Sequence, residues 1–233
     1  PLNPYGYSKF LFDQIVRRHF NGTHEKTAWK RLRRLVKCGF FKVGTLELNG
    51  HCARIVQPMP TVWPYICEKF PFTIETPHFK SESPEHDVRA TEVFMRFEKL
   101  ECYRTFFTEN LLQSSLAFVE DERFADVVRM QPDGVLIVSD AKKTERVYAV
   151  ELELSKKSPA RYREKLAAYY LARGIDGVLY ISSRREVERL IARMDEEIRS
   201  ERSSILYFSS EANVLAEVPQ LIFTTSEGAK LEF

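Results

Sequence analysis

The stretch VYAVELELSKK, residues 147–157, decides which fold this chain is expected to adopt. Successive side chains of a β-strand point to opposite faces, so every second residue shares a face. One face of this stretch is apolar throughout and consists of Tyr148, Val150, Leu152 and Leu154. The other face starts with small or apolar residues and ends with Glu151 and Glu153. We therefore expect a strand with one core face and with two carboxylates where its second face leaves the core.

The residues around this strand predict a mixed α/β domain. Short apolar runs alternate with segments of helical periodicity, and this alternation is typical of a sheet that is covered by helices. A short helix that carries Glu109 is expected directly after the first strand. The expected strands cover residues 103–107, 135–138, 147–154, 178–182 and 205–208. The expected long helices cover residues 86–102, 159–173 and 184–202.

Acids from separate segments are expected to meet near the end of the acidic strand. Asp133 directly precedes the apolar strand VLIV, residues 135–138, and Glu109 lies on the short helix. Carboxylate oxygens are the ligands that Mg²⁺ prefers, and a lysine neutralises the charge that develops on a phosphate during cleavage. The pattern predicts a nuclease site in which Asp133 and Glu151 bind Mg²⁺. Its catalytic residues would be Glu109, Asp133, Glu151, Glu153 and Lys156.

The same acids also allow an interpretation without chemistry. Glu-x-Glu is a common pattern on strands, and here basic residues follow it closely. Glu151 and Glu153 would then form an exposed ion network with Lys156, Lys157 or Arg161. Spacing alone favours neither interpretation, so both remain open at this point.

The N-terminal part of the chain is far more basic than the rest. The formal net charge of the whole chain is +2, but residues 17–42 contain nine Lys or Arg and one acid, Glu25. A basic block on an otherwise acidic protein is typical of a surface that binds a polyanion. We therefore expect nucleic acid as a partner.

The same part has the order of elements of a winged helix-turn-helix. Helical periodicity covers residues 10–20 and 25–38, and Gly39 follows at the position typical of a C-terminal cap. The Asn49-Gly50 pair further on is a strong signal for a β-hairpin. The two strands of this hairpin are expected over residues 41–48 and 52–57.

The basic helix, residues 25–38, would lie in the major groove of DNA, and the hairpin would touch phosphates beside it. The predicted partner is therefore duplex DNA. The alternative is a pair of helices whose basic face is only solvated, although nine bases against one acid exceed what solubility requires. The candidate DNA contacts are Lys26, Lys30, Arg31, Arg33, Arg34, Lys37 and Lys42.

The N-terminal stretch FDQIVRRHFNGTHEKTAWKRLRRLVKCGFF, residues 12–41, resembles the winged-helix part of the replication-relaxation family. Proteins of this family belong to plasmids and other mobile elements, and their pattern is QI-x-x-x-x-F followed by a basic RLRRLV-x-x-G helix. The second half of the family is similar to the PD-(D/E)XK restriction-endonuclease-like fold. Similar stretches of this chain are His86-Asp87-Val88, QPDGVLIV and AVELELSKKSPARYREKLAAYY, so the resemblance covers most of residues 12–175.

The resemblance also implies roles for the acids. In it, Glu109 matches a helix glutamate, Asp133 matches the aspartate of the PD pair, and Glu151 matches the next acid. The chain departs from the nuclease signature at Glu153, where the signature has a lysine. Without a lysine nearby, the domain would be an inactive or regulatory relative of these nucleases. The ammonium group could instead come from Lys156, Lys157 or Lys165.

We expect an α/β (α+β) protein in three segments. Residues 1–58 would form the winged helix-turn-helix, residues 59–83 a packed linker, and residues 84–233 a restriction-endonuclease-like domain. The expected function is duplex DNA binding in the replication, transfer or regulation of a plasmid or other mobile element. The alternatives are a Mg²⁺-dependent endonuclease of the PD-(D/E)XK type that acts on duplex DNA, and a protein-interaction module whose sheet domain forms a homodimer.

Composition narrows the remaining classes. No apolar run approaches the roughly 20 residues of a membrane span. The scattered histidines and the lack of a Gly-rich phosphate loop argue against zinc hydrolases and nucleotide hydrolases. Because the first residue is Pro1 rather than Met, we expect that the chain begins inside a longer protein. We expect a cytoplasmic protein with four buried thiols outside any zinc-site spacing, namely Cys38, Cys52, Cys67 and Cys102.

Overall fold

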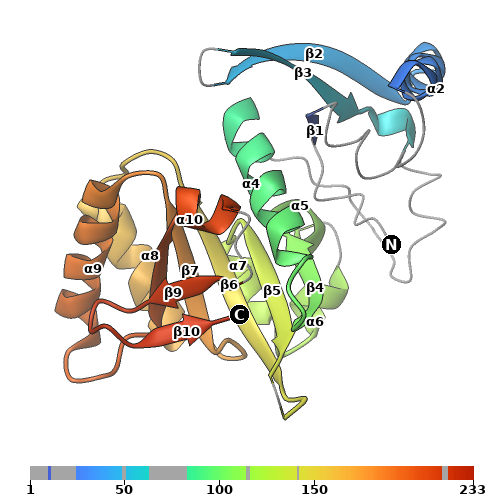
Figure 1. Ribbon diagram of the computed structural model, residues 1–233. Coiled ribbons are helices and arrows are strands. Elements are labelled where there is room, and N and C mark those ends of the chain that lie inside the picture. Colours follow the sequence, from blue (N-terminus) through green and yellow to red (C-terminus); the bar gives the residue numbers. More distant parts are fainter. Residues whose placement is uncertain are drawn as a thin grey trace.

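The structure is a computed structural model that describes residues 10–11, 25–48, 51–62, 83–113, 116–140, 142–216 and 220–233. These residues form two β-sheets (Figure 1). A sheet of three strands belongs to the N-terminal part, and a sheet of seven strands belongs to the larger part that follows. The acidic strand predicted from VYAVELELSKK lies inside the larger sheet.

The larger sheet has the strand order β10-β9-β8-β7-β6-β5-β4. Its central strands are parallel, namely β6 (Glu145–Glu153), β7 (Gly177–Ser182) and β8 (Leu206–Ser210). The other neighbours pair in antiparallel fashion, through β4 (Tyr103–Thr108), β5 (Gly134–Ser139), β9 (Ile222–Thr224) and β10 (Lys230–Glu232). The prediction of a mixed α/β fold is confirmed.

Burial on both faces explains why the central strands could be predicted. Every residue of β5 and of β7 is buried. A strand that is covered on both sides has a continuous apolar sequence, and VLIV and VLYI are such runs. All five predicted strands of this part agree with the observed strands to within two residues at each end. The sequence analysis missed the short strands β9 and β10 and the short helices Leu116–Glu120, Ala125–Met130 and Glu211–Leu215.

Helices cover both faces of the larger sheet (Figure 1). One face carries α4 (Pro84–Phe97) and α10 (Glu211–Leu215). The opposite face carries α8 (Pro159–Leu171) and α9 (Arg185–Arg199). Three short helices pack against β5, namely α5 (Glu109–Leu112), α6 (Leu116–Glu120) and α7 (Ala125–Met130).

Two of the long helices begin with the same signal, a serine followed by a proline. The hydroxyl oxygen of Ser83 accepts a hydrogen bond from the N–H of His86 at 3.1 Å, and that of Ser158 accepts one from the N–H of Arg161 at 3.3 Å. Such a serine satisfies an open N–H of the first turn, and a proline at the next position has no N–H to lose. The end of the helix predicted over residues 86–102 is wrong, because residues 98–102 form turns that lead into β4.

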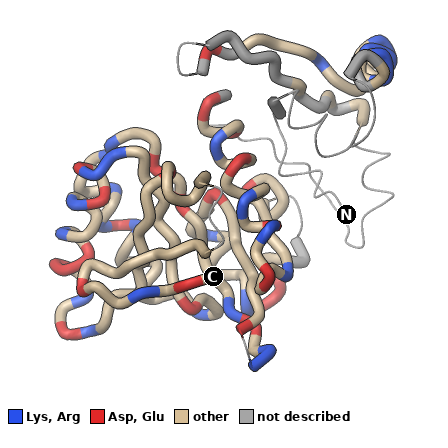
Figure 2. Tube along the Cα trace, viewed as in Figure 1, with Lys and Arg blue, Asp and Glu red and all other residues tan. Residues whose placement is uncertain are grey.

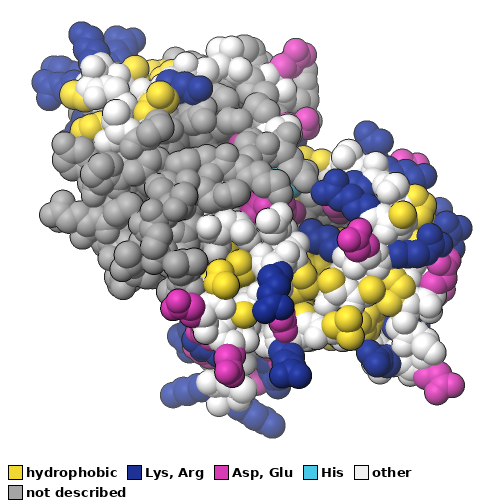
Figure 3. Space-filling model, turned by 180° about the vertical axis from the view of Figure 1, so that it is seen from behind, with side chains coloured by type: hydrophobic (Ala, Val, Ile, Leu, Met, Phe, Trp, Pro, Cys, Tyr) yellow, Lys and Arg dark blue, Asp and Glu magenta, His cyan; other side chains and the backbone are white. Residues whose placement is uncertain are grey.

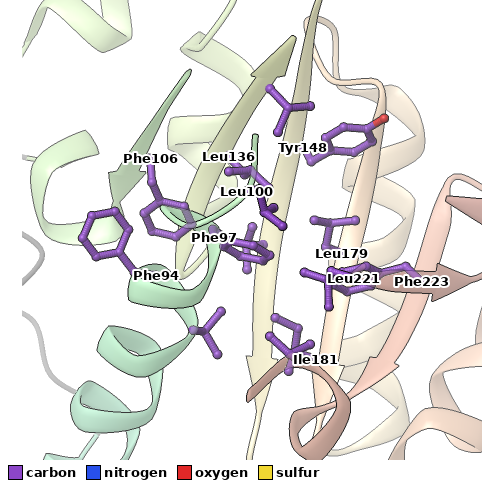
Figure 4. Packing of buried hydrophobic residues seen from close by; sticks show 14 of the residues in the cluster. Phe94, Phe97, Leu100, Phe106, Leu136, Tyr148, Leu179, Ile181, Leu221 and Phe223 are labelled. Carbon is purple, nitrogen blue, oxygen red and sulfur yellow. The ribbon is translucent and has the colours of Figure 1, made fainter. Parts of the chain in front are cut away.

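A large apolar core fixes α4 on the sheet (Figure 4). Phe94 and Phe97 of α4 pack against Phe106 of β4, with ring centroids 5.1 and 6.0 Å apart. Phe223 of β9 is fully buried in the same cluster. Complete burial of one such side chain contributes about 1.5–3 kcal/mol. This packing determines where the first turn of α4, which carries His86, meets the acidic strand.

The smaller sheet has the order β1-β3-β2 and contains β1 (Phe10–Leu11), β2 (Phe41–Leu48) and β3 (His51–Pro58). The pairing of Leu48 with His51 leaves two residues for the turn, as expected for the predicted hairpin. The helix predicted over residues 10–20 is wrong at residues 10–11, which form β1. The rest of that helix lies outside the described residues.

The basic helix α2 (Glu25–Lys37) ends in a glycine cap, as predicted. Gly39 has a φ of +74°, and its N–H donates to the carbonyl of Val36 at 2.9 Å. The N–H of Phe40 donates to the carbonyl of Leu35 at 3.0 Å. This pair of bonds is the Schellman arrangement, which requires a left-handed residue that glycine adopts without steric cost.

The remaining expectations for the N-terminal part meet the structure at few points. A short 3₁₀ helix, η1 (Pro60–Val62), follows β3, and most of the predicted linker lies outside the described residues. Cys38 is exposed, so its predicted burial is wrong. It follows a helix whose buried face is the one that carries Leu32. Cys102 is partly buried, whereas Cys67 and the side chain of Cys52 lie outside what the structure describes. No helix within the described ranges is long and apolar enough to cross a membrane.

Candidate functional site

The end of β6 carries Glu151 and Glu153 on the face that α8 covers. Only 2% of Glu151 and 3% of Glu153 are exposed. We predicted that these acids lie where the face leaves the core, and this is wrong because α8 continues over them. The helix packs here because Tyr162, Leu166 and Tyr169 recur at helical spacing and are buried against the sheet.

Glu151 is held by two side chains of α8. The Nζ atom of Lys165 donates a hydrogen bond to Oε2 of Glu151 at 2.7 Å. The hydroxyl of Tyr169 donates to Oε1 of the same carboxylate. Lys165 and Tyr169 are four residues apart and therefore lie on the same side of the helix. Lys165 was one of three lysines expected to supply an ammonium group here, and the structure selects it for Glu151.

Asp133 lies beside Glu151 and binds groups from two other elements. Its Oδ2 atom accepts a hydrogen bond from the backbone N–H of Leu152 in β6 at 2.6 Å. Its Oδ1 atom lies 3.3 Å from Nε2 of His86, on the first turn of α4. The charge of Asp133 is among the influences that raise the pKa of Glu151. Asp133 therefore lies within electrostatic reach of Glu151, and a shared role of these two acids in a site stays a prediction.

Glu153 forms a second set of bonds next to the first. The Nζ atom of Lys157 donates to its Oε1 atom at 2.7 Å, and the hydroxyl of Tyr162 donates to its Oε2 atom at 2.8 Å. The alternative interpretation, an ion network of the two glutamates, correctly included Lys157 but wrongly placed the network at the surface. Lys156, the lysine predicted as catalytic, is exposed, and the lysines that meet the acids are its neighbour Lys157 and Lys165.

Glu109 approaches the cluster through its backbone. It is the first residue of α5, and its N–H donates to the carbonyl of Asp133 at 3.1 Å. Its side chain is partly buried. The short helix therefore lies where the sequence placed it, directly after β4 and beside the segment that carries Asp133.

The surroundings move the pKa values of the two neighbouring acids in opposite directions. Burial raises the pKa of Glu151 to about 7, although the charge of Lys165 acts against this rise. Burial would also raise the pKa of Asp133, but the hydrogen bond from His86 and the positive charges nearby lower it overall. The charges of Glu151 and Asp133 raise the pKa of Lys165 despite its desolvation. Lys165 therefore stays protonated and compensates the acids.

The carboxylates do not fit a Mg²⁺ ion in this arrangement. Both oxygens of each carboxylate already contact a protein donor, namely His86 and Leu152 for Asp133, Tyr169 and Lys165 for Glu151, and Lys157 and Tyr162 for Glu153. Within the described ranges, no group of three or more His, Cys, Asp or Glu is placed to hold a metal ion. A bound Mg²⁺ needs several oxygens that face it. The donors present would first have to leave these oxygens.

A cleft with a volume of about 520 Å³ lies next to the acids. It is bounded by the first turns of α4 and by the loops that follow β6 and β7, the ends at which parallel strands commonly bind ligands. His86 and Lys157 connect the cleft with the buried acids. Its rim also carries Arg89, Arg184 and Glu211, so both signs of charge are present.

The basic residues of α2 form a separate candidate site. Leu32 is buried against Val56 of β3, and Trp29 and Val36 pack around this contact. The opposite side of the helix is exposed and basic. Figure 2 shows the lysines and arginines of α2 in blue. Figure 3 shows the same basic side chains gathered at one corner of the molecule. The exposed bases are Lys30, Arg31, Arg33, Arg34 and Lys37.

This basic face also contains a groove. It has a volume of about 530 Å³ and is lined by Trp29 together with four of the bases. The guanidinium group of Arg33 lies 5.8 Å from the ring centroid of Trp29. Lys42, predicted in the wing, is exposed on β2, whereas the side chain of Lys26 lies outside what the structure describes. The predicted bases whose side chains are described are therefore all exposed.

Several residues of the buried cluster were missed by the sequence analysis. His86 belonged only to a stretch used for the family resemblance, and Tyr162 and Tyr169 had no predicted role. Tyr162, Lys165 and Tyr169 recur at i, i+3 and i+7 directly after the acidic strand, and this spacing is a signal for polar groups on the inner side of the helix.

Comparison with protein-family models, curated proteins and solved structures found no match to this chain.

Proposed function

We propose that this protein binds duplex DNA through the exposed basic face of α2. Further, we propose that it belongs to a plasmid or other mobile element and acts in replication, transfer or the regulation of either. The observation that carries the proposal is the row of five exposed bases on one helix whose other side is anchored on a sheet. The resemblance of residues 12–41 to the replication-relaxation family supports the choice of partner.

The dimensions and charge of α2 suit the major groove. Its 13 residues correspond to a length of about 20 Å, and the major groove is about 12 Å wide and admits a helix. Leu32 and Val56 hold the helix against the hairpin, so α2 is already folded before DNA binds. Lys42 on β2 lies on the strand that follows and would contact a phosphate beside the groove. Arginine and lysine side chains supply most contacts to DNA phosphates.

DNA binding by α2 is tested with the double variant Arg31→Ala/Arg34→Ala. Fluorescence anisotropy with a labelled duplex at several salt concentrations gives the affinity and its salt dependence. The logarithm of the binding constant falls linearly with the logarithm of the salt concentration, and each lost phosphate contact makes this slope less steep by about 0.9. The two changes together should make it less steep by about 1.8. A matched control is Arg189→Ala/Arg193→Ala, which removes the same charge from exposed positions of α9. Equal slopes and affinities for both double variants would remove the basis of the proposal.

The endonuclease alternative has its own assay. Supercoiled plasmid is incubated with the protein and Mg²⁺ or Mn²⁺, next to the Asp133→Ala variant. We expect no nicking that depends on Asp133, because the oxygens of the three acids are bonded to protein donors. Nicking by the wild type and not by the variant would favour the endonuclease.

A further inference from the structure

The ammonium group of Lys165 places a positive charge of the protein itself next to the buried acids. Nζ of Lys165 lies 2.7 Å from Oε2 of Glu151, and Lys165 also interacts electrostatically with Asp133. The side chain of Lys165 is 25% exposed, against 3% for Glu151. Lys165 is therefore the most exposed of these three residues, because the side chain of Asp133 is 17% exposed and that of Glu151 lies behind the ammonium group.

We propose that Lys165 is the resident counter-ion of Asp133 and Glu151 and that it excludes a divalent cation from these two acids. The protein then keeps the cluster without metal. Removal of the Lys165 ammonium group turns the two carboxylates into a site for a hard divalent cation such as Mn²⁺.

The first reason is the cost of buried charge. Above the pKa of Glu151, about 7, both acids are ionised, and two carboxylates that share a buried position need a positive charge close to them. An ammonium group is a compact charge that can fill the place of a small cation between oxygens. Lys165 is attached to a helix that Leu166 and Tyr169 hold on the sheet, so the ammonium group is always present at this position. A metal ion must displace it and also lose its own water.

The second reason is that the neighbouring acid is neutralised in the same way. Glu153 pairs with Lys157 and Tyr162. Glu151 pairs with Lys165 and Tyr169. Glu151 and Glu153 thus each have one lysine and one tyrosine of their own. This repeated arrangement compensates the acids fully and leaves neither of them to a metal.

The third reason is an unsatisfied group beside the acids. The hydroxyl of Tyr180 is buried and has no hydrogen-bond partner among the described residues. Tyr180 lies opposite Glu151 in the pairing of β6 with β7, and its hydroxyl interacts electrostatically with Glu151, Glu153 and Asp133. A buried polar atom without a partner commonly marks a place for a water or an ion. Tyr180 would hold a water of the metal shell once the ammonium group is removed.

The proposal is tested on the whole chain with Mn²⁺ alone as the probe. Calorimetric titration and thermal unfolding are measured for the wild type, for Lys165→Ala and for the control Lys156→Ala, which removes an exposed lysine nearby. We expect no binding of millimolar Mn²⁺ to the cluster in the wild type or the control. We expect Lys165→Ala to bind Mn²⁺ and to gain about 4 °C in Tm at ten times its Kd. The double variant Lys165→Ala/Asp133→Ala should lose this gain.

Two results would overturn the proposal. One is binding of Mn²⁺ by the wild type that disappears in Asp133→Ala, because the acids would then accept a metal in the presence of Lys165. The other is a Lys165→Ala variant whose Tm and heat signal do not respond to Mn²⁺. If this variant is unfolded without metal, the readout is refolding on addition of Mn²⁺, followed by near-UV circular dichroism. Failure to refold counts against the proposal in the same way.

Discussion

The pKa of Glu151 predicts how the stability of the protein depends on pH. Burial raises this pKa from 4.5 to about 7. The folded protein therefore keeps a proton on Glu151 at pH values at which the unfolded chain has released it. By proton linkage, the contribution of Glu151 to the free energy of unfolding is largest below pH 4.5 and falls as the pH rises to about 7.

The size of this effect follows from the shift. One pKa unit corresponds to about 1.4 kcal/mol, so the rise from 4.5 to about 7 corresponds to a loss of about 3 kcal/mol between these pH values. Water screens little of it, because only 3% of the Glu151 side chain is exposed. The pKa of Asp133 is lowered and that of Lys165 is raised, so both groups titrate outside this range. Burial also raises the pKa of Glu211, so the effect of Glu211 on stability must be separated from that of Glu151 by comparison with a variant.

The comparison uses Glu151→Gln, which keeps the shape of the side chain and cannot titrate. The free energy of unfolding is measured by urea denaturation at several pH values between about 4.5 and 8 for the wild type and the variant. We expect the wild-type curve to fall by about 3 kcal/mol more than the variant curve over this range. Glu164→Gln, at an exposed position of α8, is the control, and its curve should run parallel to that of the wild type. Parallel curves for Glu151→Gln and the wild type would refute the assignment of the raised pKa.

Two further substitutions test single contacts by urea denaturation. Tyr169→Phe removes the hydroxyl that donates to Glu151 and leaves a buried carboxylate oxygen without this donor, so the free energy of unfolding should fall by about 1–3 kcal/mol; an unchanged midpoint would contradict the contact. Gly39→Ala introduces a Cβ at a φ of +74°, where a side chain is strained, and should lower the stability of the N-terminal part by about 1–2 kcal/mol; a gain in stability would speak against the left-handed cap.

The two charged regions of this protein differ in exposure, and this difference separates their roles. The bases of α2 lie at the surface on one helix face, where they can reach a large anionic partner. Glu151 and Glu153 of β6 lie under α8, and protein donors already compensate their charge. The first arrangement suits binding to a phosphate backbone, whereas the second suits a structural ion cluster. For this reason the proposed DNA contact is assigned to α2 and not to the acids.

The sequence by itself determined the local elements of the larger part. Period-two alternation and apolar runs placed its five main strands, because a strand buried on both faces has a continuous apolar sequence. Gly39 marked the end of α2, since a left-handed cap requires a residue without a Cβ. Short elements such as α7, β9 and β10 were missed, because three to six residues are too few to show a period.

Only the tertiary structure decided the state of the acids. Glu151 and Glu153 have the same alternation whether their face is solvated or covered, and the packing of α8 made it covered. The choice of Lys165 for Glu151 depends on a contact across 14 positions, and the choice of His86 depends on a helix 66 positions away from Leu152 in the chain. Side chains so far apart in sequence meet only because the sheet and its helices pack in one way. Pattern and spacing describe neighbours along the chain, whereas burial and charge compensation are properties of the packed molecule.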